Sequence, residues 1–123
     1  MNIMNANPVF SLHIPTRILF GCGEIKKLAT EILPGKKAMI IISGGTSMKK
    51  YGYLDKVTSF LTENDVASIV YDKILPNPIK SHVMEAAAIC REQGCDFIIG
   101  LGGGSTIDSA KAIAVKIGRA SCR

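Results

Sequence analysis

The sequence predicts an α/β fold, with a Rossmann-like, open and mainly parallel sheet that carries helices on both faces. Three apolar runs typical of buried strands begin at residues 38, 66 and 95, so they start 28 and 29 residues apart. That spacing is the length of a strand–helix–strand unit. Segments with helical spacing of apolar residues lie between the runs. Strands that alternate with helices in this way form parallel sheets covered on both faces.

A further strand and helix are predicted before the first of these runs. Thr16–Gly21 has the apolar, β-branched character of a short strand. The helix is predicted from apolar residues at positions i, i+3, i+4, i+7 and i+8, namely Ile25, Leu28, Ala29, Ile32 and Leu33. Pro34 and Gly35 end it, because neither residue continues a helix well.

The remaining elements follow in regular order. Strands are predicted over Ala38–Ser43, Val66–Asp72 and Cys95–Gly102. Helices are predicted over Leu54–Glu63, Ser81–Gly94 and Thr106–Lys116, with Ser81 as the N-cap of the second. The segment Leu75–Lys80 holds two prolines and is predicted to be a rigid connector.

Length and charge restrict the function classes. The 123 residues fit one domain, which we expect over residues 1–117, with residues 118–123 as a disordered tail or a cloning remnant. The net charge is +5, but the basic residues are scattered, so we expect no nucleic-acid partner. No apolar run approaches the ~20 residues of a membrane span, and no signal peptide is visible. We therefore expect a cytoplasmic protein with no membrane partner.

Cysteines and histidines give no metal-binding pattern. The four cysteines form no C-x-x-C pair, and the two histidines, His13 and His82, lie at no zinc-site spacing. We expect reduced, mostly packed thiols and no metal site within this chain.

The glycine-rich stretch Gly100–Ser105 follows a predicted strand and opens a predicted helix. Glycines there let the backbone approach a ligand, and the N–H groups of a helix start attract phosphate. The stretch lacks the order of a Walker A loop, and it follows at least two earlier strand–helix units, unlike the usual dinucleotide fingerprint. We predict a phosphate cradle of related geometry; the alternative is a tight turn that binds nothing.

Three polar residues follow the glycines, and two interpretations of them stay open. Ser105 and Asp108 have the spacing of a helix capping box, and Lys111 could pair with Asp108 one turn along. Alternatively, Asp108 and Lys111 line the floor of a cleft near a nicotinamide.

Four segments together resemble the iron-containing (group III) alcohol dehydrogenase family. They are "PTRILFGCGEIKKLA", "AMIIISGGTSMKKYGYLDKV", "YDKILPNPIKSHVMEAAAICREQGCDFIIGLGGGS" and "GLGGGSTIDSAKAIA". The resemblance implies a dinucleotide-binding domain followed by a helical domain, and hydride transfer between NAD(P) and an alcohol or aldehyde. It also implies iron, or zinc, held by residues of that helical domain, which this sequence does not contain.

The resemblance assigns cofactor-binding candidates but no catalytic or metal-binding residue. Gly103, Gly104 and Ser105 would contact the pyrophosphate, and Asn77 would lie near the adenosine end. The full set of candidates is Gly44, Gly45, Asn77, Gly102, Gly103, Gly104, Ser105, Asp108 and Lys111.

One departure from the family bears on NAD against NADP. NAD-preferring members place an aspartate just after the strand matched by Ala38–Ser43, where its carboxylate would repel a 2′-phosphate. This sequence has Gly44 and Gly45 there, with Lys49 and Lys50 nearby. We therefore predict that the longer enzyme accepts NADP(H) and can prefer it; the alternative is that the two glycines only turn the chain.

Other functions remain open at this stage. The chain could be a non-catalytic nucleotide-binding module, or part of a relative of the glycerol dehydrogenases. The expected substrate is a small alcohol or aldehyde. Helix faces that would pack on a second domain predict self-association of the isolated chain, and we expect a homo-oligomer.

Overall fold

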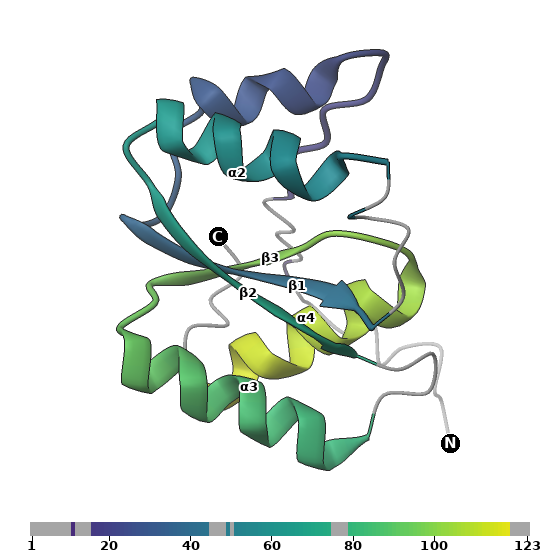
Figure 1. Cartoon of the computed structure of the whole chain (residues 1–123), viewed down its shortest axis with the longest axis vertical. Coiled ribbons are helices and arrows are strands. Elements are labelled where there is room, and N and C mark those ends of the chain that lie inside the picture. Colours follow the sequence, from purple (N-terminus) through teal and green to yellow (C-terminus); the bar gives the residue numbers. More distant parts are fainter. Residues whose placement is uncertain (1–10, 12–15, 45–48, 50, 75–78, 119–123) are drawn as a thin grey trace, which may run out of the picture.

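The computed structural model describes residues 11, 16–44, 49, 51–74 and 79–118. Its elements are η2 (Glu24–Ala29), β1 (Lys37–Ser43), α2 (Tyr53–Glu63), β2 (Ala67–Ile74), α3 (Lys80–Gln93), β3 (Phe97–Gly100) and α4 (Gly104–Lys116). Figure 1 shows these elements wound around one sheet.

The sheet has three parallel strands in the order β2-β1-β3, which confirms the predicted parallel α/β fold. Ile40 of the central strand lies opposite Val70 on one side and Ile99 on the other. The five residues Ala38–Ile42 are buried. A central parallel strand is covered on both faces, so its sequence is continuously apolar.

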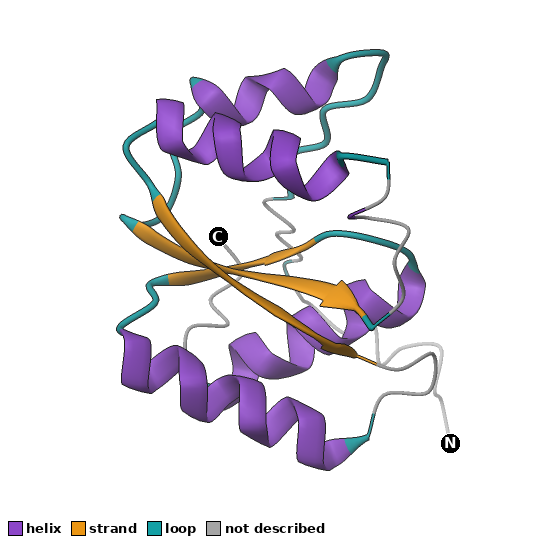
Figure 2. Ribbon diagram, in the orientation of Figure 1, coloured by secondary structure: helices purple, strands orange, loops and turns teal. Residues whose placement is uncertain are grey.

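Helices cover both faces of the sheet, as predicted. Figure 2 shows η2 and α2 on one face and α3 and α4 on the other. Met39 and Ile41 pack with Ile113 in one core cluster. Ile40 packs with Leu61 in the other. Successive residues of a strand point to opposite faces, so β1 alone supplies both cores.

The strand predicted over Thr16–Gly21 is wrong. Residues 16–20 are exposed and carry no strand, and Phe20 is 96% exposed. A strand needs a neighbour for its N–H and C=O groups, and the three-stranded sheet of the described ranges does not extend to this segment. Local β propensity alone does not supply that neighbour.

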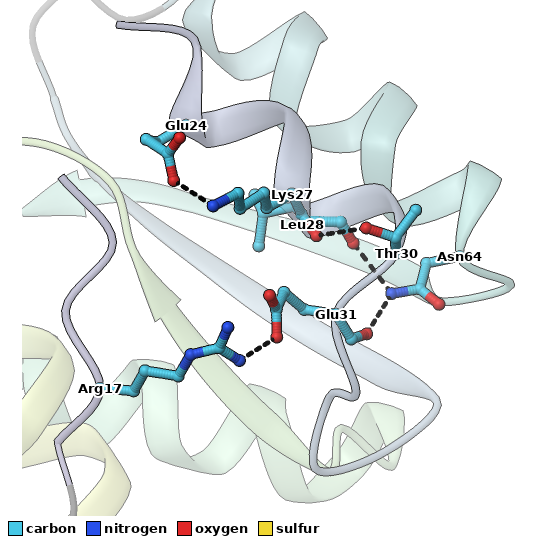
Figure 3. A network of polar contacts seen from close by, with 7 residues as sticks. All are labelled: Arg17, Glu24, Lys27, Leu28, Thr30, Glu31 and Asn64. Carbon is cyan, nitrogen blue, oxygen red and sulfur yellow. Dashed lines mark hydrogen bonds and ion pairs between the residues drawn. The ribbon is translucent and has the colours of Figure 1, made fainter. Parts of the chain in front are cut away.

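The helix predicted from Ile25 to Leu33 is also wrong, because the structure has a short 3-10 helix, η2, instead. The Asn64 side chain, just after α2, donates hydrogen bonds to the carbonyls of Leu28 (2.9 Å) and Glu31 (2.7 Å). Figure 3 shows this link together with the ion pair of Arg17 and Glu31. A long-range contact therefore uses the Leu28 carbonyl, which a continued α-helix would bond to the Ile32 N–H, and the Glu31 carbonyl near the predicted helix end.

The other predicted elements are present, with boundaries that differ by one or two residues. The cap predicted at Ser81 is wrong, because α3 begins earlier and its N-cap is Ile79, whose apolar side chain makes no capping hydrogen bond. Residues 75–78 of the predicted connector lie outside the described residues.

Candidate cofactor-binding site

The ends of β1 and β3 lie side by side at the point where the strand order reverses, with Ile41 opposite Gly100. From β1 the chain crosses to β2 on one side, whereas β3 lies on the other side of β1. In open α/β sheets, ligands bind beyond the carboxyl ends of the strands at such a point. Gly44 follows β1 and the glycine stretch follows β3, so both predicted segments lie at this edge (Figure 1).

Two glycines of the stretch are required by packing. A Cβ added to Gly100 would lie 3.0 Å from the Cβ of Ala110, so glycine lets α4 approach the strand closely. Gly102 has φ +148°, a conformation that other residues rarely adopt, and its added Cβ would lie 3.0 Å from the Thr106 Oγ1 atom. These two glycines shape the turn and say nothing by themselves about a ligand.

The next two glycines face open space. A Cβ added to Gly103 or Gly104 would meet no other heavy atom within 4 Å. Gly103 is the N-cap of α4 and has no side chain to accept from the first-turn N–H groups. Those N–H groups and the positive end of the helix dipole favour an anion, and a phosphate can approach without meeting a side chain. This geometry fits the pyrophosphate of a dinucleotide.

Of the two open interpretations of Ser105 and Asp108, the capping box is wrong. Ser105 lies inside the first turn of α4, one residue past the helix start at Gly104. Its carbonyl accepts a hydrogen bond from the Ser109 hydroxyl (2.8 Å). Because Gly103 is the N-cap, α4 starts earlier in the sequence than the capping box requires, and Ser105 is not at the N-cap position.

Asp108 and Lys111 are not brought together. Both are exposed on α4, and no ion pair between them is present in the described part of the chain. Asp108 lines a groove of about 460 Å³ between the start of α3 and α4, together with Lys80 and Lys116. Lys111 does not line that groove. The α4 surface therefore offers two separate polar positions.

The remaining predicted residues divide between described and undescribed parts. Gly44 is exposed, and its N–H donates to the carbonyl of Ile74 at the end of β2 (2.8 Å). Gly45 and Asn77 lie outside the described residues.

Sequence reasoning missed an ion pair beside Gly44. The Lys49 Nζ atom lies 2.6 Å from the Asp72 Oδ2 atom. The hydrogen bond from Lys49 is the main cause that lowers the pKa of Asp72 below its ordinary value. The sequence indicates Lys49 as a cation near Gly44, but it indicates Asp72 only as the end of a strand.

Across the described ranges, no three His, Cys, Asp or Glu side chains lie together so that they could hold a metal ion. Among the described helices, none combines the length and apolar character that crossing a bilayer requires.

Comparisons with known proteins agree on one family. The family model described as iron-containing alcohol dehydrogenase matches residues 15–122. The NADH-dependent butanol dehydrogenase A of Clostridium acetobutylicum is 37% identical over 108 residues, which are 88% of this chain and 28% of that protein. The NADPH-dependent aldehyde reductase YqhD of Escherichia coli is 44% identical over 105 residues, 85% of this chain and 26% of that protein.

Solved structures show the same likeness. The crystal structure of the NADH-dependent butanol dehydrogenase A of Thermotoga maritima superposes with a TM-score of 0.79 at 36% identity. The superposed region covers 88% of this chain and 27% of the Thermotoga maritima chain. The chain thus spans about a quarter of the length of the relatives it matches.

Proposed function

This chain belongs to the iron-containing alcohol dehydrogenase family, and we propose that it forms the NAD(P)-binding part of an enzyme that transfers a hydride between the cofactor and a small alcohol or aldehyde. We propose residues 1–117 as the dinucleotide-binding domain. The substrate class rests on the names of the relatives, which include a butanol dehydrogenase and an aldehyde reductase.

The observation that carries the proposal is the pair of open glycines at the start of α4. Gly103 and Gly104 leave room for the pyrophosphate directly over the helix N-terminus, at the carboxyl edge of the sheet. Gly102, whose φ the turn requires, directs the backbone from β3 into the start of α4. When bound, the cofactor would supply or accept the hydride, and these residues would hold and orient it.

Other site residues would contact the cofactor on either side of this proposed pyrophosphate-binding site. Gly44, and with it Gly45, would face the adenosine ribose from the end of β1, and Asn77 would lie near the adenosine. Ser105 would add a hydroxyl beside the pyrophosphate, and Asp108 and Lys111 would lie along α4 toward the nicotinamide. Iron, or zinc, would be held by residues beyond this chain in the longer enzyme.

We propose that the site accepts NADP(H) and can prefer it. The glycine at position 44 places no carboxylate directly after β1, so a 2′-phosphate meets no negative charge from that residue. The relatives include both NADH-dependent and NADPH-dependent enzymes, so the family fold accommodates either cofactor. At least tenfold tighter binding of NADH than of NADPH would reject the preference.

Titration of the 123-residue chain with NADPH and NADH, followed by the cofactor's fluorescence, tests binding. Saturable binding is expected, and it should weaken when Gly103 is replaced by valine. Absence of saturable binding of either cofactor to the folded chain would reject the proposed function.

For the 123 residues alone we propose nucleotide binding without turnover, because they match only about a quarter of the length of the relatives. An assay with butanol, NADP⁺ and Fe²⁺ should give no product from this chain by itself. Turnover would show that the chemistry does not need the part of the relatives that this chain does not match.

We further propose a cytoplasmic location and assembly with copies of itself. Cys22 and Cys95 are free thiols, which fits a reducing compartment. Phe20 and Ile32 are 96% and 99% exposed, and such apolar surface favours association. A monomer by light scattering at ~100 µM would count against the assembly.

A further inference from the structure

Strand β2 carries an irregularity beside the proposed ribose site. Ile41 of β1 pairs with Tyr71, but Ser43, two residues on, pairs with Ile74, three residues on. The extra residue on β2 therefore falls at Asp72–Lys73. A bulge of this kind redirects side chains and is common next to binding sites.

The two bulge residues bind partners from different elements. Asp72 pairs with Lys49, which comes from the segment between β1 and α2. Lys73 pairs with Glu85 of α3 at 3.2 Å. Asp72 thus forms an ion pair with Lys49, which follows β1 in the sequence, and Lys73 forms one with a residue of α3.

Gly44 connects the first of these pairs to the proposed cofactor site. A Cβ added to Gly44 would lie 3.3 Å from the Asp72 carbonyl oxygen. The turn after β3 begins beside the end of the same strand β1, because the Leu101 N–H donates a hydrogen bond to the Ile41 carbonyl (2.9 Å). A cofactor that rests its pyrophosphate on Gly103 and its ribose near Gly44 therefore places the ribose next to Lys49 and Asp72.

The Lys49–Asp72 pair is built so that it can open. The side chains are 50% and 43% exposed, and ion pairs at such exposed sites contribute little to stability. Lysine carries its charge on a flexible stem with three rotatable donors. A phosphate monoester carries a charge of about −1.5 to −2 and competes well for such a cation.

We propose that the Lys49–Asp72 pair reads the 2′ position of the cofactor's adenosine ribose. For NADP(H), Lys49 leaves Asp72 and binds the 2′-phosphate. For NAD(H), Lys49 stays in place and Asp72 accepts a hydrogen bond from the 2′-hydroxyl, so an acid of β2 replaces the acid absent after β1. This inference rests on the proposed function and explains how one site takes both cofactors.

Fluorescence titration of the variants with NADPH and NADH at low ionic strength tests the inference. Lys49→Gln should weaken NADPH binding about tenfold and leave NADH binding within about twofold, because only the phosphate needs the cation. Asp72→Asn should weaken NADH binding about threefold or more and leave NADPH binding equal or tighter, because Lys49 is released. Lys49→Arg should retain most of the NADPH affinity.

Lys73→Gln is the matched control, since it removes the same charge from the same bulge but from a pair with Glu85. It should change neither affinity by more than about twofold. Equal losses of NADPH affinity in Lys49→Gln and Lys73→Gln would overturn the inference in favour of general charge attraction. Equal changes for the two cofactors in Lys49→Gln would overturn it as well. If the unaltered chain binds neither cofactor, the proposed function fails, and this inference fails with it.

Discussion

At the amino edge of the sheet, the Asp96 carboxylate accepts hydrogen bonds from the backbone N–H groups of Lys36 (2.7 Å) and Lys37 (3.1 Å). The Lys37 ammonium in turn donates to the carbonyl of Gln93 at the end of α3 (2.8 Å). At the carboxyl edge, by contrast, Gly103 and Gly104 face open space and the nearby ion pair is half exposed. One edge uses its polar groups internally, and the other leaves them accessible.

The glycines show the same contrast. A Cβ added to Gly35 at the amino edge would lie 2.3 Å from the Asp96 Cβ atom, whereas one added to Gly104 would meet nothing within 4 Å. Glycine at the first edge serves packing, and glycine at the second leaves room for a ligand. Substitutions at the two edges should therefore separate stability from cofactor binding.

The largest effect is expected for Gly35→Ala. The added methyl group must displace Asp96 or the backbone, so unfolding free energy should fall by about 2–3 kcal/mol. Urea unfolding measures this loss. Cofactor affinity of the folded fraction should stay within about twofold. A loss below about 0.5 kcal/mol would contradict the close contact with Asp96.

Cys95, next to Asp96, should make the amino edge sensitive to alkaline pH. Burial, with the neighbouring Cys90, raises the Cys95 pKa from 9.0 to about 11. A raised pKa stabilises the fold below the unfolded pKa, and this contribution is lost as pH rises from about 9 to about 11. Unfolding free energy should drop by about 1–3 kcal/mol more across this range than in Cys95→Ala.

Urea unfolding at pH 8, 9.5 and 11 provides the measurement. Cys22, which is exposed, should react with a thiol reagent in the native protein, while Cys90 and Cys95 should react only on unfolding. These reactions are best followed with Cys122 replaced by serine, since that residue lies outside the described part. Parallel pH dependence in Cys95→Ala and the unaltered chain would exclude the thiol as the cause.

At the carboxyl edge, Gly104→Ala should weaken cofactor binding about tenfold, because the methyl group occupies space proposed for the pyrophosphate. The unfolding free energy should stay equal or rise by up to about 1 kcal/mol, since alanine restricts the unfolded chain more than glycine does. Fluorescence titration and urea unfolding check the two halves. If Gly104→Ala lowers the unfolding free energy and leaves cofactor affinity unchanged, Gly104 serves packing, and the proposed difference between the two edges is wrong.

The smallest effect is expected for the stability of Asp72→Asn. Lys49 lowers the pKa of Asp72, so the pair stabilises the fold above the ordinary aspartate pKa, and this is lost as pH falls below it. Exposure limits the loss at pH 7 to about 0.5 kcal/mol, and the loss should become smaller as pH falls from the ordinary aspartate pKa through the lowered one. Thermal unfolding at pH 7 and at successively lower pH values checks this. A loss that does not decrease as pH falls would assign the effect to something other than charge.

The sequence was sufficient to predict an element wherever a pattern of neighbouring residues by itself determines the local structure. The apolar run Ala38–Ile42 predicts a central strand, because only a strand covered on both faces is apolar at every position. The regular spacing of three such runs predicts parallel pairing. The position of the glycine stretch between strand and helix predicts a phosphate cradle, which stays a prediction; Gly103 and Gly104 leave the open space that it requires.

Sequence reasoning failed where distant groups decide. Thr16–Gly21 has the composition of a strand, but no strand of the described sheet lies beside it. In the segment after Ile25, the carbonyls of Leu28 and Glu31 accept hydrogen bonds from the side chain of Asn64, which lies over thirty positions away. Composition and periodicity describe what a segment can do alone, and hydrogen bonds to remote groups change that preference.

The sequence by itself therefore determined the family, the order of strands and helices along the chain, and the glycines that a phosphate would approach. Only the tertiary structure decided that Gly100 and Gly102 serve packing, that Gly103 rather than Ser105 caps α4, and that Asp72 lies against Lys49. The physical reason is common to all three. Each depends on which atoms of separate elements come within a few ångströms, and that is fixed by sheet register and helix packing.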